Sequence, residues 1–234
     1  MDWIATFHVV RERHRRQLVV MARMLTDRWR LRGVDGLVFA RVLGTGRGQD
    51  TGTSADLLRQ AYFLVWRDAA AAARFLDDHP LARRWERLTV EHQLGLRLVS
   101  GHGTWSGCSL LEGMPHVAPD GEVVVLTRAR IRLRSWRAFR RASRGTSLAA
   151  VPGLCWTLGV GELPVCLLGT VSCWRSVGDL DAWRSTDASH SRTAAHAPNW
   201  FAESLFARFT PFDLSAGSRE ENGSGQTERF RRSG

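Results

Sequence analysis

Gly153-Leu-Cys-Trp-Thr-Leu-Gly-Val-Gly-Glu-Leu-Pro164 runs directly into Val165-Cys-Leu-Leu-Gly-Thr-Val-Ser-Cys-Trp174 in the last third of the chain. Apolar, β-branched and aromatic residues on either side of the Gly-Glu-Leu-Pro turn predict two paired strands, residues 154–160 and 165–174. A membrane-spanning helix needs about 20 nearly uninterrupted apolar residues, whereas prolines, glycines and Glu162 interrupt this run. We therefore expect a strand pair within a globular fold.

The segments around this pair extend it into a larger unit. The sequence predicts a helix over residues 177–195 and a strand over residues 205–212 after the pair. Before it, a strand is expected over residues 122–132 and a short arginine-rich helix over residues 135–143, with Ser135 as its N-cap. The second half of the chain therefore has the predicted order strand, helix, strand, strand, helix, strand.

The first half has the same predicted order of elements. Leu18, Met21, Met24 and Leu25 recur at helical spacing and are expected to form a core-facing stripe. Pro80 is expected to end or interrupt the second helix. The expected strands are residues 2–10, 37–43, 61–66 and 91–99, the expected helices are residues 12–31 and 68–76, and residues 44–54 are expected to be a loop.

A short internal echo supports two similar halves. Trp66-Arg67-Asp68 precedes one predicted helix and Trp174-Arg175-Ser176 precedes another, and nine residues after each tryptophan comes an aromatic residue, Phe75 or Trp183. Two βαββαβ units in tandem predict an α+β protein made of tandem ferredoxin-like repeats, closed into an α/β barrel with an apolar interior. The expected divisions are a first ferredoxin-like half (1–100), a connecting loop (101–121), a second half (122–214) and a disordered tail (215–234).

Composition places the chain among globular proteins with an unusual surface. The 234 residues are 44% hydrophobic, the formal net charge is +10, and every basic residue is arginine because the chain contains no lysine. Such a surface favours anionic partners such as acidic lipid headgroups or nucleic acid. We expect no nucleic acid, because neither a helix-turn-helix nor an aromatic RNA-binding pattern accompanies the charge.

The four cysteines show no Cys-x-x-Cys pairing, and the N-terminus shows no basic leader. The expected location is the cytoplasm, with peripheral contact to an anionic membrane as an extension of that prediction. The familiar zinc, phosphate-loop, dinucleotide and Gly-x-Ser-x-Gly patterns are missing from the sequence.

His190 is the main candidate for a metal ligand. If residues 177–195 are helical, Trp183, Thr186, Asp187 and His190 share one face. Neutral imidazole is a good axial ligand for haem iron, and Asp187 would be placed to hold the other ring nitrogen. The residues alone leave open the alternative that His190 is a surface or half-buried histidine without a ligand.

Arg128 and Arg130 lie two residues apart in one predicted strand, so their side chains point the same way. If that face turns inward, the two guanidinium groups are expected to pair with haem carboxylates or with Glu162. If it turns outward, they are solvated surface charges.

Several stretches together resemble the spheroidene monooxygenase family of carotenoid oxygenases. The first half matches more loosely than the second, and the resemblance covers most of residues 1–212. The stretches are Leu126-Thr-Arg-Ala-Arg-Ile-Arg132, Gly159-Val-Gly-Glu-Leu-Pro164, Thr170-Val-Ser-Cys-Trp174, a helix with His190, Trp200-Phe-Ala-Glu-Ser-Leu-Phe-Ala-Arg-Phe209 and, more loosely, Gly44-Thr-Gly-Arg-Gly48, Tyr62-Phe-Leu-Val-Trp-Arg-Asp68 and Gly103-Thr-Trp-Ser-Gly107.

The resemblance implies a haem-containing monooxygenase that uses O2 to oxygenate an acyclic carotenoid, with His190 as the axial ligand and an unidentified electron donor. The segment between His190 and Trp200 is shorter than the family pattern and contains Pro198, so His196 is the alternative ligand. Two other functions remain open: a cofactor-free α/β barrel that binds a hydrophobic small molecule without catalysis, and a cofactor-free monooxygenase.

Overall fold

The computed structural model describes residues 2–13, 17–46, 55–142, 151–162, 167–186 and 199–214. Each half of the chain follows the order strand, helix, strand, strand, helix, strand, and the first half adds a short third helix. The first half contains β1 (Ile4–Arg11), α1 (Gln17–Arg30), β2 (Leu37–Gly46), β3 (Ala55–Trp66), α2 (Ala69–Asp78), α3 (Pro80–Trp85) and β4 (Thr89–Gly103). The second contains β5 (Val123–Ile131), α4 (Trp136–Ala142), β6 (Leu154–Glu162), β7 (Leu167–Trp174), α5 (Val177–Thr186) and β8 (Phe201–Phe212), with 3-10 turns η1 (Leu110–Gly113) and η2 (Leu133–Ser135).

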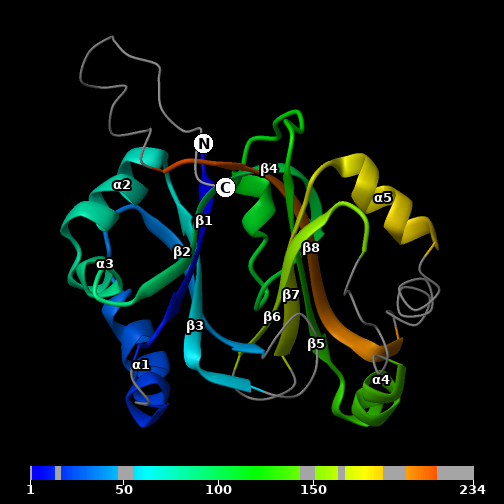
Figure 1. The fold of residues 1–234 in the computed structure, drawn as a ribbon, viewed down its shortest axis with the longest axis horizontal. Coiled ribbons are helices and arrows are strands. Elements are labelled where there is room, and N and C mark those ends of the chain that lie inside the picture. Colours follow the sequence, from blue (N-terminus) through cyan, green and yellow to red (C-terminus); the bar gives the residue numbers. More distant parts are fainter. Residues whose placement is uncertain are drawn as a thin grey trace.

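These strands form one closed antiparallel barrel in the order β1-β3-β2-β6-β7-β5-β8-β4. The two halves meet along two seams of unequal length. β4 pairs with β8 from Gly95↔Phe212 to Gly103↔Leu205, whereas the described residues of β2 and β6 pair at Gly44↔Gly161 and Thr45↔Val160. Figure 1 shows α1, α2 and α3 on one side of the barrel and α4 and α5 on the opposite side. The predicted α+β barrel is therefore confirmed.

The barrel interior is packed with side chains. Alternate residues of each strand point inward, and the segment that links the two halves adds Trp105, Leu110, Leu111 and Met114 to the same core. The Trp105 ring stacks on Phe63 with 5.3 Å between ring centroids. The linking segment therefore fills the centre of the barrel, which the sequence predicted to be apolar.

Helices of the first half cover the outer face of their sheet closely. Trp85 at the end of α3 lies over the outward-facing rings of His8 and Tyr62, with centroid distances of 4.7 and 4.6 Å. Phe75 of α2 lies against Trp66 at 5.0 Å. His8, Tyr62, Trp66, Phe75 and Trp85 are all buried, so this side of the barrel has a second apolar core.

The predicted core-facing stripe of α1 is wrong at three of its four residues, and of the four only Met24 packs against the buried layer of the first half. Leu18, Met21 and Leu25 are exposed, and the buried side of the helix instead carries Val20 and Asp27. The Asp27 carboxylate is fully buried because Arg84 donates to both of its oxygens, at 3.0 and 2.5 Å, and the Tyr62 hydroxyl donates at 2.8 Å. The prediction used the spacing of apolar residues alone, so it could not recognise that the inner face of α1 carries a buried carboxylate.

Several boundaries also differ from the predicted ones. β3 begins at Ala55 instead of residue 61. Ion pairs hold its polar N-terminal residues in the sheet, because Arg11 and Arg59 both contact Asp56 and Glu91. β4 runs from Thr89 to Gly103 instead of over residues 91–99.

Some predictions fall outside the described residues. Helix α5 is described through Thr186, while residues 187–195 of the longer predicted helix and the tail (215–234) are not described. Within the described ranges, no helix is both long enough and apolar enough to cross a bilayer.

Candidate functional site

Four charged side chains meet inside the barrel and form what we call the internal charge cluster: Arg41, Arg128, Glu162 and Glu203. Arg128 Nε lies 3.4 Å from Glu162 Oε1, and Arg41 Nε lies 3.3 Å from Glu162 Oε2. The Arg128 guanidinium also donates to Glu203. Arg128 is only 3% exposed, so its positive charge is stabilised by these two carboxylates rather than by water.

The internal charge cluster also holds the linking segment in place. The indole N–H of Trp105 donates to Glu162 at 2.7 Å. Glu203 accepts from the Thr104 hydroxyl at 3.0 Å and from the Gly107 backbone N–H at 2.7 Å. Two glutamates on β6 and β8 therefore fix the position of the chain that fills the barrel.

The cluster is electrically balanced, with two arginines and two glutamates. Burial raises the pKa of Glu203, but hydrogen bonds from Arg128, Gly107 and Thr104 outweigh burial and lower it to about 2. For Arg41, burial lowers the pKa and Glu162 partly offsets that change. A carboxyl group whose pKa is held this low does not exchange protons near neutral pH, so Glu203 suits a supporting role better than proton transfer.

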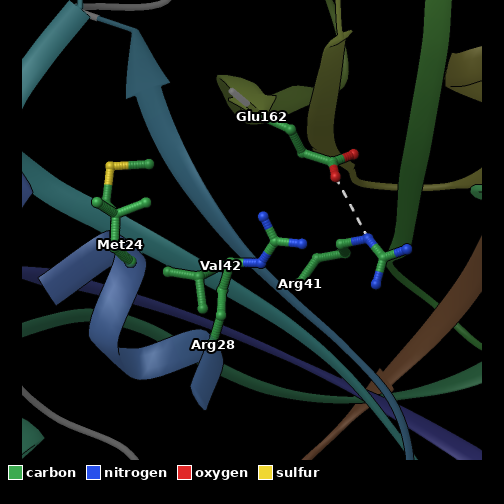
Figure 2. A pocket seen from close by; sticks show the side chains of 6 residues that line it. Met24, Arg28, Arg41, Val42 and Glu162 are labelled. Carbon is green, nitrogen blue, oxygen red and sulfur yellow. Dashed lines mark ion pairs between the residues drawn. The ribbon is translucent and has the colours of Figure 1, made fainter. Parts of the chain in front are cut away.

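A small pocket lies beside this cluster, between α1, β2 and the end of β6. It is lined by Met24, Leu25, Arg28, Arg41, Val42 and Glu162. Figure 2 shows the Arg41 side chain reaching from β2 toward Glu162 at one end of this pocket. Its volume of about 20 Å³ is that of a water molecule, so it cannot hold a macrocycle or a carotenoid chain.

The two predicted arginines of the site, Arg128 and Arg130, have different surroundings in the structure. Arg128 faces inward and pairs with Glu162, one of the partners expected for it, whereas Arg130 is exposed at the end of the same strand. His190, His196 and Asp187 lie outside the described residues, so their roles stay predictions.

Among the described residues, the apolar layer on the outer face of the second half is smaller than that of the first. Its apolar cluster of Val123, Val125, Trp174 and Leu180 is small. By register, Thr127 and Thr170 occupy the positions that His8 and Tyr62 occupy in the first half, because both pairs lie four residues from the paired ends of their strands. Thr127 is exposed and Thr170 is half-buried.

Three members of the internal charge cluster and its surroundings were missed from the sequence: Arg41, Trp105 and Glu203. Trp105, Arg128, Glu162 and Glu203 each lie in a different one of the stretches that resemble the carotenoid oxygenases. The shared motifs were therefore the signal that could have predicted this cluster. The fold brings together residues of these motifs that are separated by up to about 100 positions in the sequence.

Curated relatives decide the family. A spheroidene monooxygenase from Rubrivivax gelatinosus is 35% identical over 186 residues, which is 78% of this chain and 72% of the relative. The chain belongs to the spheroidene monooxygenase family. A second spheroidene monooxygenase, from Rhodobacter capsulatus, is 29% identical over 81% of this chain and 82% of the relative. The chain is therefore a monooxygenase, and the family resemblance predicted from its motifs is confirmed.

Solved structures agree on the fold. A crystal structure of the aldoxime dehydratase OxdRE in complex with butyraldoxime matches with a TM-score of 0.55 over 91% of this chain and 80% of that one. A second aldoxime dehydratase structure matches with a TM-score of 0.52. Both are 14% identical in sequence, so the likeness concerns the fold alone. No family model matches the chain.

Proposed function

We propose that this spheroidene monooxygenase homologue is haem-dependent and uses O2 to oxygenate an apolar, carotenoid-like substrate. The observation that carries the proposal is the 35% identity to a spheroidene monooxygenase over 78% of the chain. Haem iron would supply the activation of O2. One oxygen atom enters the substrate and the other leaves as water, with two electrons and two protons supplied by an external donor.

His190 is the proposed axial ligand, and its place along the chain supports this role. Residues 187–198 follow α5 in the second half, as α3 follows α2 in the first. In the first half, Trp85 of α3 covers His8 and Tyr62. We infer that the haem lies against the corresponding positions of the second half, Thr127 and Thr170.

The described residues of this outer face fit such a group better than the barrel interior does. The interior is filled by Trp105 and its neighbours, whereas Thr127 is exposed and Phe206 is half-buried on the outer face. The Thr157 hydroxyl on the same face is buried and has no hydrogen-bond partner among the described residues. An apolar wall with a few unused polar atoms is typical of a cofactor site.

The two arginines receive different assignments in this proposal. Arg128 is engaged by Glu162 and Glu203 on the inner face, so we assign it to the internal charge cluster rather than to the haem carboxylates. Arg130 is exposed at the end of β5 but lies on the same side of the strand as Arg128, so a haem on the outer face gives no support to its pairing with a haem carboxylate, and that role stays a prediction.

The first test is the cofactor spectrum of protein purified from haem-supplemented cells. We expect a Soret band that is lost in His190→Ala and kept in His196→Ala. The reverse result would move the axial role to His196. Protein without haem that still binds an acyclic carotenoid would favour the cofactor-free binding protein, and haem-free turnover would favour the cofactor-free monooxygenase.

A second test addresses where the haem lies. Thr127→Phe places a ring on the outer face of the second half, where the first half has His8, and is expected to prevent haem incorporation while the protein remains folded. Thr89→Phe is the matched control, because Thr89 is also exposed on a strand but belongs to β4. Full haem content in Thr127→Phe would exclude this outer face.

The proposed membrane contact is supported by the outer surface of α1. Leu18, Met21, Leu25 and Trp29 are 82%, 47%, 59% and 65% exposed and recur on one side of the helix. The only acid in the helix, Asp27, faces inward and is neutralised by Arg84.

The same helix carries the positive charge that such a contact needs. Arg28, Arg30 and Arg32 are exposed around the apolar residues, and the Arg32 guanidinium lies 3.7 Å from the centre of the Trp29 ring. A helix with arginines, a tryptophan, exposed aliphatic side chains and no exposed acid is suited to an anionic lipid surface. We therefore propose that α1 docks the enzyme on the bilayer that holds its substrate.

Vesicle sedimentation tests this docking role. Binding is expected for vesicles with acidic lipid, to weaken in high salt, and to fall at least tenfold in Leu25→Glu. Leu133→Glu is the control, because Leu133 is 80% exposed but lies beside α4, on the opposite side of the barrel. Binding that ignores acidic lipid and salt, or equal binding by both variants, would contradict the role of α1.

We also propose that the two halves are tandem copies of one ferredoxin-like unit. Each half has the strand order fourth-first-third-second, and β2 and β4 meet their counterparts β6 and β8 at the seams. A separately expressed half that assembles into a two-chain barrel would support this proposal, and a half that never pairs would weaken it.

A further inference from the structure

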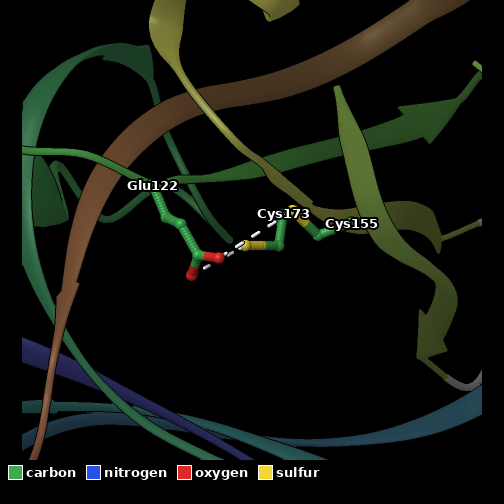
Figure 3. A group of neighbouring side chains, drawn as sticks. All are labelled: Glu122, Cys155 and Cys173. Atoms are coloured by element: carbon green, nitrogen blue, oxygen red, sulfur yellow. Dashed lines mark hydrogen bonds between the residues drawn. The ribbon is translucent and has the colours of Figure 1, made fainter. Parts of the chain in front are cut away.

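A second group of chemically active side chains lies outside the internal charge cluster and the proposed haem site. Glu122 immediately precedes β5, Cys155 lies in β6 and Cys173 lies in β7. Figure 3 shows the three side chains converging from these segments. Their ligand atoms all lie within 4.8 Å of one another.

A bulge in β6 explains how both cysteines reach the same side of the sheet. The pairing of β6 with β7 shifts between Leu154↔Trp174 and Trp156↔Cys173, which leaves Cys155 as the extra residue. In a regular strand Cys155 and Trp156 would point to opposite faces, whereas a bulge changes the direction of the extra side chain. Cys155 is thereby aimed toward Cys173.

The two sulfur–oxygen separations in this group are close to the ligand–ligand separations of a metal coordination shell. Cys173 Sγ lies 3.7 Å from Glu122 Oε2, and Cys155 Sγ lies 3.9 Å from Glu122 Oε1. In a tetrahedral zinc site, bond lengths of about 2.3 Å to sulfur and about 2.1 Å to oxygen place neighbouring ligands about 3.6–3.8 Å apart. The three side chains need little movement to surround one ion.

We propose that Glu122, Cys155 and Cys173 form a binding site for a thiophilic divalent cation of the Zn²⁺ class, with the fourth position open to water. Two sulfurs and one carboxylate select zinc-like ions over Mg²⁺ or Ca²⁺, which prefer all-oxygen shells. Glu122 and Cys155 are exposed and Cys173 is buried, so solvent gives the ion access while the barrel wall holds one ligand rigidly.

Hydrogen bonds in the metal-free group hold the three side chains close together. Cys155 and Cys173 both donate to Glu122, one to each carboxylate oxygen. A divalent cation bound here would take the place of the thiol protons, which would be released to solvent.

Zinc titration of the full-length reduced protein against a competing chelator is the direct test. We expect one Zn²⁺ per chain and, with Co²⁺ as a spectroscopic probe, a thiolate-to-metal charge-transfer band. Loss of a ligand in Cys155→Ala or Glu122→Gln should weaken binding by more than about 100-fold, since even residues that only support ligands are worth about 10–100-fold.

Cys108→Ala is the matched control, because Cys108 is an exposed free cysteine of the linking segment. Both test variants alter exposed side chains, so unfolding should not mimic the loss of binding, and circular dichroism checks this point. Failure of the native protein to bind Zn²⁺, or equal binding by Cys155→Ala and Cys108→Ala, would overturn the proposal. Haem content, measured in the same samples, separates this outcome from failure of the proposed oxygenase function.

Discussion

The two halves of the barrel follow the same path but cover their sheets differently. Each half has a tryptophan at the end of its third strand that packs on an aromatic residue nine positions later: Trp66 on Phe75 at 5.0 Å and Trp174 on Trp183 at 5.2 Å. In the first half this pair belongs to an extensive buried layer under α1, α2 and α3. In the second half the corresponding cluster has four buried members among the described residues.

Within the described residues, the outer face of the first half therefore contributes more apolar packing to the fold than that of the second. Where the first half has the rings of His8 and Tyr62 under Trp85, the second half has the small polar side chains of Thr127 and Thr170. A sheet face with small residues and little apolar cover stabilises the fold less and leaves room for a ligand. Stability and ligand binding are therefore expected to respond to mutation in opposite halves.

The largest expected effect comes from the equivalent aromatic residues of the two helices. Phe75→Ala should lower the free energy of unfolding by about 3–5 kcal/mol, because it removes a fully buried ring. Trp183→Ala should cost only about 1–2 kcal/mol, because Trp183 is half-buried. Urea denaturation of haem-free protein measures both values.

Haem content is the second property by which these two variants are compared. Trp183→Ala is expected to reduce haem retention, whereas Phe75→Ala should leave it unchanged under conditions where the protein is folded. Equal losses of stability in the two variants would mean that the halves do not differ in the way their cores suggest.

Acid should destabilise the protein through a residue of the first half. Burial lowers the pKa of His8 to about 3, so the folded protein does not take up the proton that the unfolded chain binds below about pH 6.5. The free energy of unfolding should therefore fall with decreasing pH between about 6.5 and 3, by about 1.4 kcal/mol per pH unit from this group. Denaturation at pH 7.5, 6 and 5 measures the slope.

His8→Phe should remove this part of the pH dependence. His116→Phe is the control, because His116 is exposed in the linking segment and should leave the slope unchanged. Identical slopes in the native protein and His8→Phe would show that His8 is protonated in the folded state, and that Trp85 covers it less tightly than the structure indicates.

The features predicted correctly from the sequence are those set by local residue patterns and by their repetition along the chain. The echo of Trp66-Arg-Asp and Trp174-Arg-Ser correctly marked two equivalent strand ends, because a tryptophan before a capped helix is a local signal. The inner face of α1 was predicted wrongly except at Met24, because the burial of Asp27 depends on Arg84 and Tyr62, which are 57 and 35 residues away. Glu203 and Trp105 were missed for the same reason: their contacts depend on pairing between distant segments.

The helix caps offer a smaller and more symmetric comparison. Asp68 accepts a hydrogen bond from the Ala71 N–H at 2.7 Å at the start of α2, and Ser176 accepts one from the Asp179 N–H at 3.1 Å at the start of α5. Asp68→Ala and Ser176→Ala should each cost about 1 kcal/mol. If only Asp68→Ala lowers the free energy of unfolding, then α5 itself contributes little stability, and the difference between the halves does not come only from how their helices contact the sheet.

Thr157→Val is expected to have the smallest effect on stability, and it tests the outer face of the second half specifically. Thr157 pairs with Ser172 two residues before Trp174, and the corresponding pair in the first half, Ala40 and Leu64, is apolar. The Thr157 hydroxyl is buried without a hydrogen-bond partner among the described residues, so Thr157→Val should change the free energy of unfolding of haem-free protein by less than about 1 kcal/mol.

Ser172→Ala should cost more than Thr157→Val, about 1 kcal/mol, because the Ser172 hydroxyl accepts from the Trp174 indole at 3.0 Å. If the hydroxyl of Thr157 serves a bound group, Thr157→Val should weaken haem retention although it spares the fold. A loss of stability in haem-free Thr157→Val equal to that of Ser172→Ala would instead assign the hydroxyl a partner within the protein. That result would make the outer face of the second half a packed surface like the first, and the proposed cofactor would have to lie elsewhere.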